Sequence, residues 1–217
     1  MTLIFVIVLQ AGGLVGRRTF RNLMLGRYRQ PRAERRFFLF VDVIGSTSIA
    51  ERLGPMQAHR FLAAVFSATA EPVAAQRGEI YQYVGDEIVI TWTAEEGVAE
   101  ARPLRCFFMI EKSLQELKES FQRDFAAEPR LRAALHLGEV IAGEVGVVRR
   151  AIVYHGDVMN TASRLEQATR DQGVRFIASD AAMQALGPQA DMELKDLGAL
   201  TLRGRKAPIN AWGVQLR

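Results

Sequence analysis

The sequence predicts an α+β domain, a sheet covered by helices, on three observations. A continuous apolar run at residues 37–43 is too short for most helices and fits a strand buried on both faces. Two further strand-like runs, 79–84 and 87–92, are separated only by Gly85 and Asp86, a pair typical of a tight turn. Segments after the first and third runs carry apolar residues at helical spacing.

The order of these elements narrows the fold. One amphipathic helix is expected from Pro55 to near Gly78, and a second over about residues 103–121. Alternation of apolar and polar residues at 131–136 predicts another strand. The order strand, helix, strand, strand, helix, strand is that of a ferredoxin-like βαββαβ core, and we expect extra C-terminal strands beyond it. This pattern indicates a fold class and leaves function open.

The positive charge is concentrated near the N-terminus. The chain carries a net charge of +4, whereas residues 17–36 alone hold eight arginines against Glu34, a net +7. The remaining chain therefore carries −3. A mildly acidic globular part argues against a nucleic-acid-binding face, so no nucleic-acid partner is expected.

Residues 1–16 form an apolar segment that precedes this basic cluster. A bilayer-spanning helix needs roughly 20 apolar residues, so the segment alone is too short. We interpret it as the end of a membrane helix or a weak anchor, with a buried amphipathic extension as the alternative. Residues 17–36 would be a helical juxtamembrane linker that stops near Pro31, and 37–217 the globular domain. An apolar stretch followed by arginines places the domain at the cytoplasmic face of a membrane.

Two carboxylates are expected to converge at one edge of the sheet. Asp42 lies in an otherwise apolar strand, where its burial must be compensated by a metal ion, a turn-capping contact or a salt bridge to one of the nearby arginines. Asp86 is at the tip of the following hairpin, which lies beside the end of that strand. One or two carboxylates together with substrate phosphates are a typical Mg²⁺ site. The turn at Gly45, Ser46 and Thr47 opens a helix whose free N–H groups could cradle a triphosphate.

A third polar group lies on a later helix. Asn160 and Arg164 are four residues apart in the segment HGDVMNTASRLE, so they share one helix face. An amide beside a guanidinium could stabilise negative charge developing on phosphate. A solvated helix face with an Asn cap is the alternative.

Three segments carry a family resemblance. FVDVIGST, YVGDEI and GDVMNTASRLE, in this order and spacing, resemble the class III nucleotidyl cyclases, the adenylate and guanylate cyclase catalytic domain. LHLGEVIAGEVG also resembles the central hairpin of that family. The resemblance covers roughly residues 36–214. It implies an adenylate cyclase that converts ATP to 3′,5′-cyclic AMP and pyrophosphate.

The resemblance also implies roles for individual residues. Asp42, Asp86 and the backbone carbonyl of Val43 would hold two divalent ions, Mg²⁺ or Mn²⁺. Asn160 would orient the ribose, and Arg164 would stabilise the transition-state phosphate. In the family these two groups come from different protomers. A head-to-tail homodimer with composite active sites is therefore implied.

Phosphate and base contacts match the family less closely. The turn at 45–47 would meet the phosphates, and Arg203 is assigned as the C-terminal phosphate-binding residue, with Arg205 and Lys206 as competitors. At the base-reading positions Gln82 replaces the lysine common in adenylate cyclases, and Val153 replaces Asp or Thr. ATP is favoured because the guanylate-cyclase pattern of Glu and Cys is also missing.

Two other functions remain as alternatives: a guanylate cyclase, and a catalytically silent module that binds nucleotide. A diguanylate cyclase shares the core and a similar GDE hairpin, but the helix with Asn160 and Arg164 has no counterpart there. Glu87 follows Asp86 directly, and strand alternation is expected to point it the other way.

Overall fold

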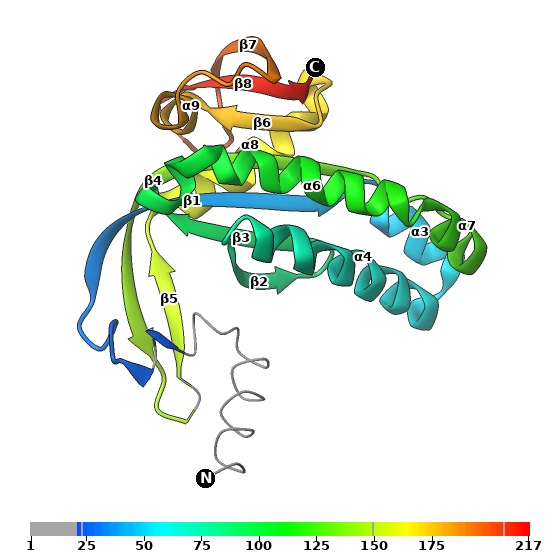
Figure 1. The fold of residues 1–217 in the computed structure, drawn as a ribbon, viewed down its shortest axis with the longest axis horizontal. Helices are drawn as coiled ribbons and strands as arrows, with labels where there is room; N and C mark the ends of the chain where they lie inside the picture. The colour runs from blue at the N-terminus through cyan, green and yellow to red at the C-terminus, as the bar shows by residue number, and fades with distance from the viewer. Residues whose placement is uncertain (1–20, 23, 149, 206) are drawn as a thin grey trace.

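The structure, a computed structural model, describes residues 21–22, 24–148, 150–205 and 207–217 (Figure 1). The strands are β1 Arg32–Val43, β2 Glu79–Val84, β3 Glu87–Thr93, β4 Leu131–Val145, β5 Ala151–His155, β6 Phe176–Ser179, β7 Met192–Leu200 and β8 Ile209–Leu216. The helices are α3 Ser46–Leu53, α4 Pro55–Ala75, α5 Ala94–Val98, α6 Arg102–Glu116, α7 Lys118–Phe125, α8 Asp157–Gln172 and α9 Asp180–Leu186, with a 3₁₀ turn at Ala99–Ala101.

The strands form one mixed sheet in the order β2-β3-β1-β4-β6-β8-β7, and β5 pairs with β4. The first four strands are antiparallel neighbours in the ferredoxin-like order, and β6, β7 and β8 extend the sheet beyond β4. The predicted α+β core with extra C-terminal strands is therefore confirmed. The far half of β4 and its partner β5 project from the body of the domain together with the start of β1 (Figure 1).

Strand β1 is buried on both faces, as its continuous apolar run predicts. Phe37 and Leu39 point to the face covered by α4 and α6, where the larger hydrophobic cluster lies. Phe38 and Phe40 point to the opposite face, where they pack with residues of α8 and β5. The side chains of β1 alternate between these two faces, and Asp42 continues the series of Phe38 and Phe40 on the α8 side.

One predicted helix is two helices in the structure. The expected element at 103–121 is divided at Leu117, which ends α6 and precedes α7. The apolar stripe nevertheless continues across the break, because Phe121 of α7 packs against Phe61 of α4 with ring centroids 5.6 Å apart. The break at Leu117 therefore leaves the apolar stripe on the face that packs against α4.

The linker ends earlier than the sequence predicts. Residues 32–36, expected to belong to the basic linker, are the first five residues of β1 and pair with β4 as far out as Ala142. Their strand conformation comes from pairing with residues about 100 positions away, which local propensity cannot reveal. The apolar segment 1–16 and residues 17–20 lie outside the described residues. Within the described part of the chain, no helix combines the length and apolar character needed to span a bilayer.

Candidate functional site

A buried charge network surrounds Asp42. Asp42 is 8% exposed, and Arg132, its cross-strand partner on β4, donates a hydrogen bond to its carboxylate. The same guanidinium forms an ion pair with Glu166 of α8, Nε to Oε1, at 2.5 Å. Arg132 and Glu166 are also buried, so the three side chains compensate one another away from water. Asp42 thus forms a salt bridge, but its partner is not one of the nearby arginines as expected: Arg132 comes from β4, 90 residues along the chain.

Asp86 lies beside Asp42, as the hairpin geometry predicts. It follows Gly85, whose φ of +62° makes the tight turn between β2 and β3, and it accepts a hydrogen bond from the Ser46 hydroxyl at the start of α3. Burial raises the pKa of Asp42; Arg132 opposes this shift and the nearby charge of Asp86 adds to it. The structure therefore brings Asp42, Asp86 and Ser46 into one cluster.

Glu87 does not point away from this cluster, so that expectation is wrong. It is directly opposite Asp42 in the register of β1 and β3, and cross-strand partners share one face of a sheet. Burial raises the pKa of Glu87 to about 7, and the charges of Glu166, Asp42 and Asp86 contribute to the shift. The site is more acidic than two aspartates alone would make it.

Helix α3 begins directly beside the two aspartates. Gly45 precedes it with φ +73°, in the left-handed region that glycine adopts most readily. No side chain caps this N-terminus among the described residues. The first-turn N–H groups, which belong to residues such as Ser46 and Thr47, have no partner within the helix and suit an anionic ligand.

Asn160 and Arg164 lie on α8 as predicted, but not toward Asp42. Glu166 lies two residues beyond Arg164, roughly 200° around the helix, and it is Glu166 that contacts Arg132. Asn160 is exposed and Arg164 is half-buried. The side of α8 that carries Asn160 and Arg164 is therefore different from the side that faces the aspartates of the same chain.

The C-terminal basic loop packs on α8. Arg205 forms an ion pair with Asp157 at 2.5 Å and donates a hydrogen bond to Thr161. Gly204 lies close to Arg164, since a Cβ built on it would be 3.5 Å from the Arg164 Nη2 atom. Arg203 is exposed in this loop, whereas Lys206 is outside the described residues. Of the three basic candidates, Arg205 thus has a structural partner and Arg203 faces solvent.

The two base-reading candidates lie on β2 and β5, two strands that do not pair with each other. Gln82 is exposed on β2 and pairs with Val89 of β3 just after a β-bulge. Val153 is half-buried on β5 and alternates with Tyr154, so it points to the other side of the β4–β5 hairpin. The rings of Tyr81 and Tyr154, their sequence neighbours, pack with centroids 5.0 Å apart.

The donor atoms near Asp42 fit a hard divalent cation. Asp42 and Asp86 supply carboxylate oxygens and Ser46 a hydroxyl, and oxygen ligands are those that Mg²⁺ and Mn²⁺ prefer. Among the described residues, no group of three or more His, Cys, Asp or Glu side chains could by itself hold a metal ion. Two carboxylates that need substrate phosphates to complete the coordination are consistent with a nucleotide-bound Mg²⁺.

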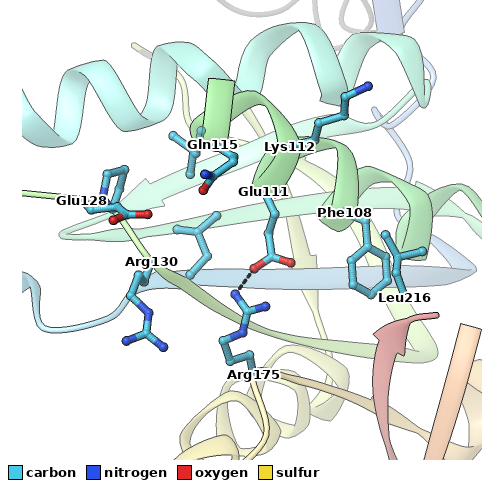
Figure 2. Close-up of a pocket in the computed structure, with 11 residues that line it drawn as sticks. Phe108, Glu111, Lys112, Gln115, Glu128, Arg130, Arg175 and Leu216 are labelled. Atoms are coloured by element: carbon cyan, nitrogen blue, oxygen red, sulfur yellow. Dashed lines mark hydrogen bonds and ion pairs between the residues drawn. The ribbon is translucent and has the colours of Figure 1, made fainter. Parts of the chain in front are cut away.

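Two surface hollows lie away from these aspartates. One of about 600 Å³ is on the α6 side of the sheet, where Glu111 and Arg175 form an ion pair among its lining residues (Figure 2). Another, of about 650 Å³, lies near the start of β1. Neither includes Asp42 or Asp86.

Sequence reasoning missed three members of the site: Arg132, Glu166 and Glu87. Arg132 and Glu166 had a signal, because a charged residue inside an apolar strand or on the inner side of a helix needs a partner. Which residues are paired depends on the register of β1 with β4 and on how α8 packs, and neither is visible in the sequence.

Comparison with known proteins agrees with this fold and these motifs. Residues 30–215 match the family model described as the adenylate and guanylate cyclase catalytic domain. The chain is 41% identical over 200 residues to adenylate cyclase 2 of Rhizobium meliloti strain 1021, covering 92% of this chain and 55% of that relative. It is 25% identical over 179 residues to guanylate cyclase 2G of Rattus norvegicus, covering 80% and 16%.

Among solved structures, the adenylyl cyclase CyaB from P. aeruginosa superposes with a TM-score of 0.75 at 17% identity, covering 87% of this chain and 97% of that one. This likeness concerns the fold. The chain spans about half the length of the Rhizobium relative, so it corresponds to one part of that protein. With a family model that matches nearly all of the described residues, the chain belongs to the adenylate and guanylate cyclase catalytic domain family.

Proposed function

We propose that this chain is an adenylate cyclase domain that converts ATP to 3′,5′-cyclic AMP and pyrophosphate. In this reaction the ribose 3′-oxygen attacks the α-phosphorus, the bond from that phosphorus to the bridging oxygen of pyrophosphate breaks, and the 3′-hydroxyl proton is released. The observation that carries the proposal is the convergence of Asp42 and Asp86 beside the uncapped N-terminus of α3. Carboxylates that bind divalent ions and N–H groups that bind phosphate are both used in phosphoryl-transfer sites.

Asp42, Asp86 and the Val43 carbonyl would hold two divalent ions, Mg²⁺ or Mn²⁺. Ions bound there supply positive charge that favours ionisation of the 3′-hydroxyl and stabilises the phosphate oxygens. The turn at 45–47 would bind phosphate through its N–H groups, and Arg203, exposed in its loop, would reach the phosphates as a charged donor. Arg132 already neutralises Asp42 in this structure, so its positive charge also lies at the edge of the site.

A second copy of the chain would complete each site. Asn160 would orient the ribose and Arg164 would stabilise charge on the transferring phosphate. Both lie on a side of α8 different from Glu166, which faces Asp42, so one chain does not direct all four residues at one substrate. A homodimer in which Asp42 and Asp86 of one protomer meet Asn160 and Arg164 of its partner resolves this geometry.

ATP is the proposed substrate. The amide of Gln82 can both donate and accept a hydrogen bond, which suits the amino group and ring nitrogen of adenine. Val153 would contribute an apolar contact to the base. The relative from Rhizobium is named an adenylate cyclase, whereas the more distant rat relative is named a guanylate cyclase, so GTP remains the second candidate.

The N-terminal residues suggest where the enzyme works. We propose that residues 1–16 attach the chain to a membrane and that the arginines of residues 17–36 keep the catalytic domain on the cytoplasmic side. Five of these arginines, at positions 21, 27, 29, 32 and 35, are exposed in the described part of the linker and the start of β1.

The test is a cyclase assay on the purified chain with ATP or GTP and with Mn²⁺ or Mg²⁺. We expect cyclic AMP from ATP, and at least about tenfold less cyclic GMP from GTP, because an unsatisfied polar base contact costs more than one kcal/mol. Asp42→Ala should abolish product. Nucleotide binding without product from either triphosphate would favour a silent nucleotide-binding module over an enzyme.

A further inference from the structure

A second buried charge cluster lies at the other end of β1, away from the aspartates. Arg36 is 1% exposed, and its guanidinium donates to Glu34 at 3.0 Å, to Glu79 of β2 at 3.0 Å and to Thr91 of β3 at 3.1 Å. Two carboxylates and a hydroxyl thus satisfy a cation that is removed from water. We call Arg36, Glu34, Glu79 and Thr91 the Arg36 cluster.

The same guanidinium stacks on an aromatic pair. The Arg36 Cζ atom lies 4.7 Å from the centroid of the Tyr154 ring on β5, and the Tyr154 ring packs on Tyr81 of β2 at 5.0 Å. Cation–π contacts are strongest when, as here, the charge is desolvated. Arg36 therefore joins β1, β2, β3 and β5 through one planar group.

The aromatic pair lies next to the two base-reading candidates. Tyr81 stands at the β-bulge of β2, where the register with β3 shifts between Ile80 and Gln82. A bulge changes the direction in which the following side chain points. Tyr154 is the residue after Val153 on β5. Contacts that hold the rings of Tyr81 and Tyr154 in place therefore also hold the adjacent backbone, which sets the direction of the Gln82 and Val153 side chains.

We propose that Arg36 is a positioning residue for base recognition, which sets the aim of Gln82 and Val153 through the stacked rings of Tyr154 and Tyr81. The proposal rests on the proposed nucleotide-cyclising function. It assigns a role in base recognition to Arg36, which would not contact the base itself and would act through Tyr154 and Tyr81. In the homodimer, each Arg36 cluster would act on Gln82 and Val153 of its own chain.

The N-terminal linker contacts the same cluster. The Tyr28 hydroxyl donates to Glu34 at 3.0 Å, and the Tyr28 ring is buried, with 2% exposure. The Tyr28 carbonyl accepts a hydrogen bond from the Glu144 backbone N–H of β4 at 2.8 Å. A displacement of the linker would therefore reach Arg36, and through it the base-reading residues.

The test compares Arg36→Lys with Arg35→Lys in the assay above. Lysine keeps the charge of Arg36 but lacks the planar group that stacks on Tyr154 and bridges two carboxylates. Arg35 is the matched control, because it is the adjacent residue of β1, is exposed and points to the opposite face. We expect Arg36→Lys to raise KM for ATP and to lower the ATP:GTP ratio of kcat/KM about fivefold or more, with kcat for ATP within about twofold of the wild type. Arg35→Lys should leave KM for ATP, kcat for ATP and the ATP:GTP ratio unchanged.

A second variant keeps the test informative if Arg36→Lys does not fold. Tyr154→Leu removes the ring and leaves the ion pairs of Arg36 with Glu34 and Glu79 in place. It should lower the ATP:GTP ratio in the same direction as Arg36→Lys. An unchanged ratio in both variants, even with a lower melting temperature, would overturn the proposal and reduce Arg36 to a structural residue.

Failure of the proposed function has a different signature. It would show as a wild-type chain that cyclises neither nucleotide. In that case the same ratio is read from the dissociation constants of ATP and GTP by calorimetry. A wild type that binds neither nucleotide would overturn both proposals, whereas binding with a ratio that depends on Arg36 would retain this one.

Discussion

Arg132 and Asp42 are cross-strand partners on β4 and β1, and the guanidinium of Arg132 donates to the Asp42 carboxylate. Arg132 also pairs with Glu166 of α8, so one cation serves two buried carboxylates. This arrangement explains how a strand that is apolar on both faces tolerates an aspartate. A divalent ion that binds at Asp42 would therefore bind a carboxylate that is already paired with the Arg132 guanidinium.

The first prediction concerns stability. Arg132→Leu should lower the free energy of unfolding by about 3–5 kcal/mol, because it leaves Asp42 and Glu166 buried without their cation. Urea unfolding of the metal-free protein measures the loss. The control is Arg175→Leu, which breaks the ion pair with Glu111 at the surface hollow (Figure 2). Arg175 is 53% exposed, so that loss should stay below about 1 kcal/mol. Equal losses in the two variants would contradict the network described for Arg132.

A second prediction follows from Glu87. Burial and the neighbouring carboxylates raise its pKa from 4.5 to about 7. Between these two values the folded protein holds a proton that the unfolded chain has released, so the contribution of Glu87 to stability falls as the pH rises through this window. Glu87→Gln removes the carboxylate and should therefore reduce the loss of stability between pH 5 and pH 8.

The measurement is the urea midpoint of both proteins at pH 5, 6, 7 and 8 in the presence of EDTA. Glu139→Gln, at an exposed position on β4, is the control and should follow the wild-type profile. If Glu87→Gln also follows the wild type, Glu87 titrates normally and does not lie close to Asp42 and Asp86.

The basic loop after β7 gives a third prediction. Arg203 is exposed, whereas Arg205 is engaged by Asp157 and Thr161 on α8. Arg203→Ala should lower kcat/KM for ATP about tenfold or more with an unchanged melting temperature, because a charge-assisted phosphate contact is lost. Arg205→Ala, unlike Arg203→Ala, should lower the melting temperature, because it removes the contacts that hold the loop on α8. The assignment of Arg203 fails if its replacement leaves kcat/KM intact.

Several features of this fold were accessible from sequence because they depend on local patterns. The apolar run around Phe40 predicted a strand buried on both faces, and the Gly85-Asp86 turn placed Asp86 next to Asp42. The start of β1 was missed, since residues 32–36 become a strand only by pairing with β4. Strand alternation from Asp86 points Glu87 away from the site, but Asp86 is in the turn, and the register of β3 with β1 places Glu87 opposite Asp42.

The partner of Asp42 shows the same limit at the site. The sequence offers nearby arginines as its counter-charge, whereas the actual partner, Arg132, is set by the register of β1 with β4 and lies 90 residues away. Arg164 points away from Asp42 because the opposite side of α8, which carries Glu166, packs against the sheet and contacts Arg132. Sequence spacing placed Asn160 and Arg164 on one helix face but did not indicate which face the sheet would cover.

The most direct test of the composite site is complementation between two inactive variants. Asp42→Ala lacks a proposed metal ligand and Arg164→Ala lacks the proposed transition-state contact, and each alone should form almost no cyclic AMP. In an equimolar mixture, the mixed dimer has one site with every group intact. We predict that mixing restores cyclic AMP formation to about one quarter of the wild-type rate at equal total protein, since half of the dimers are mixed and each has one of two sites intact. A mixture as inactive as its components, at concentrations where the wild type is dimeric and active, would contradict a site shared between two protomers.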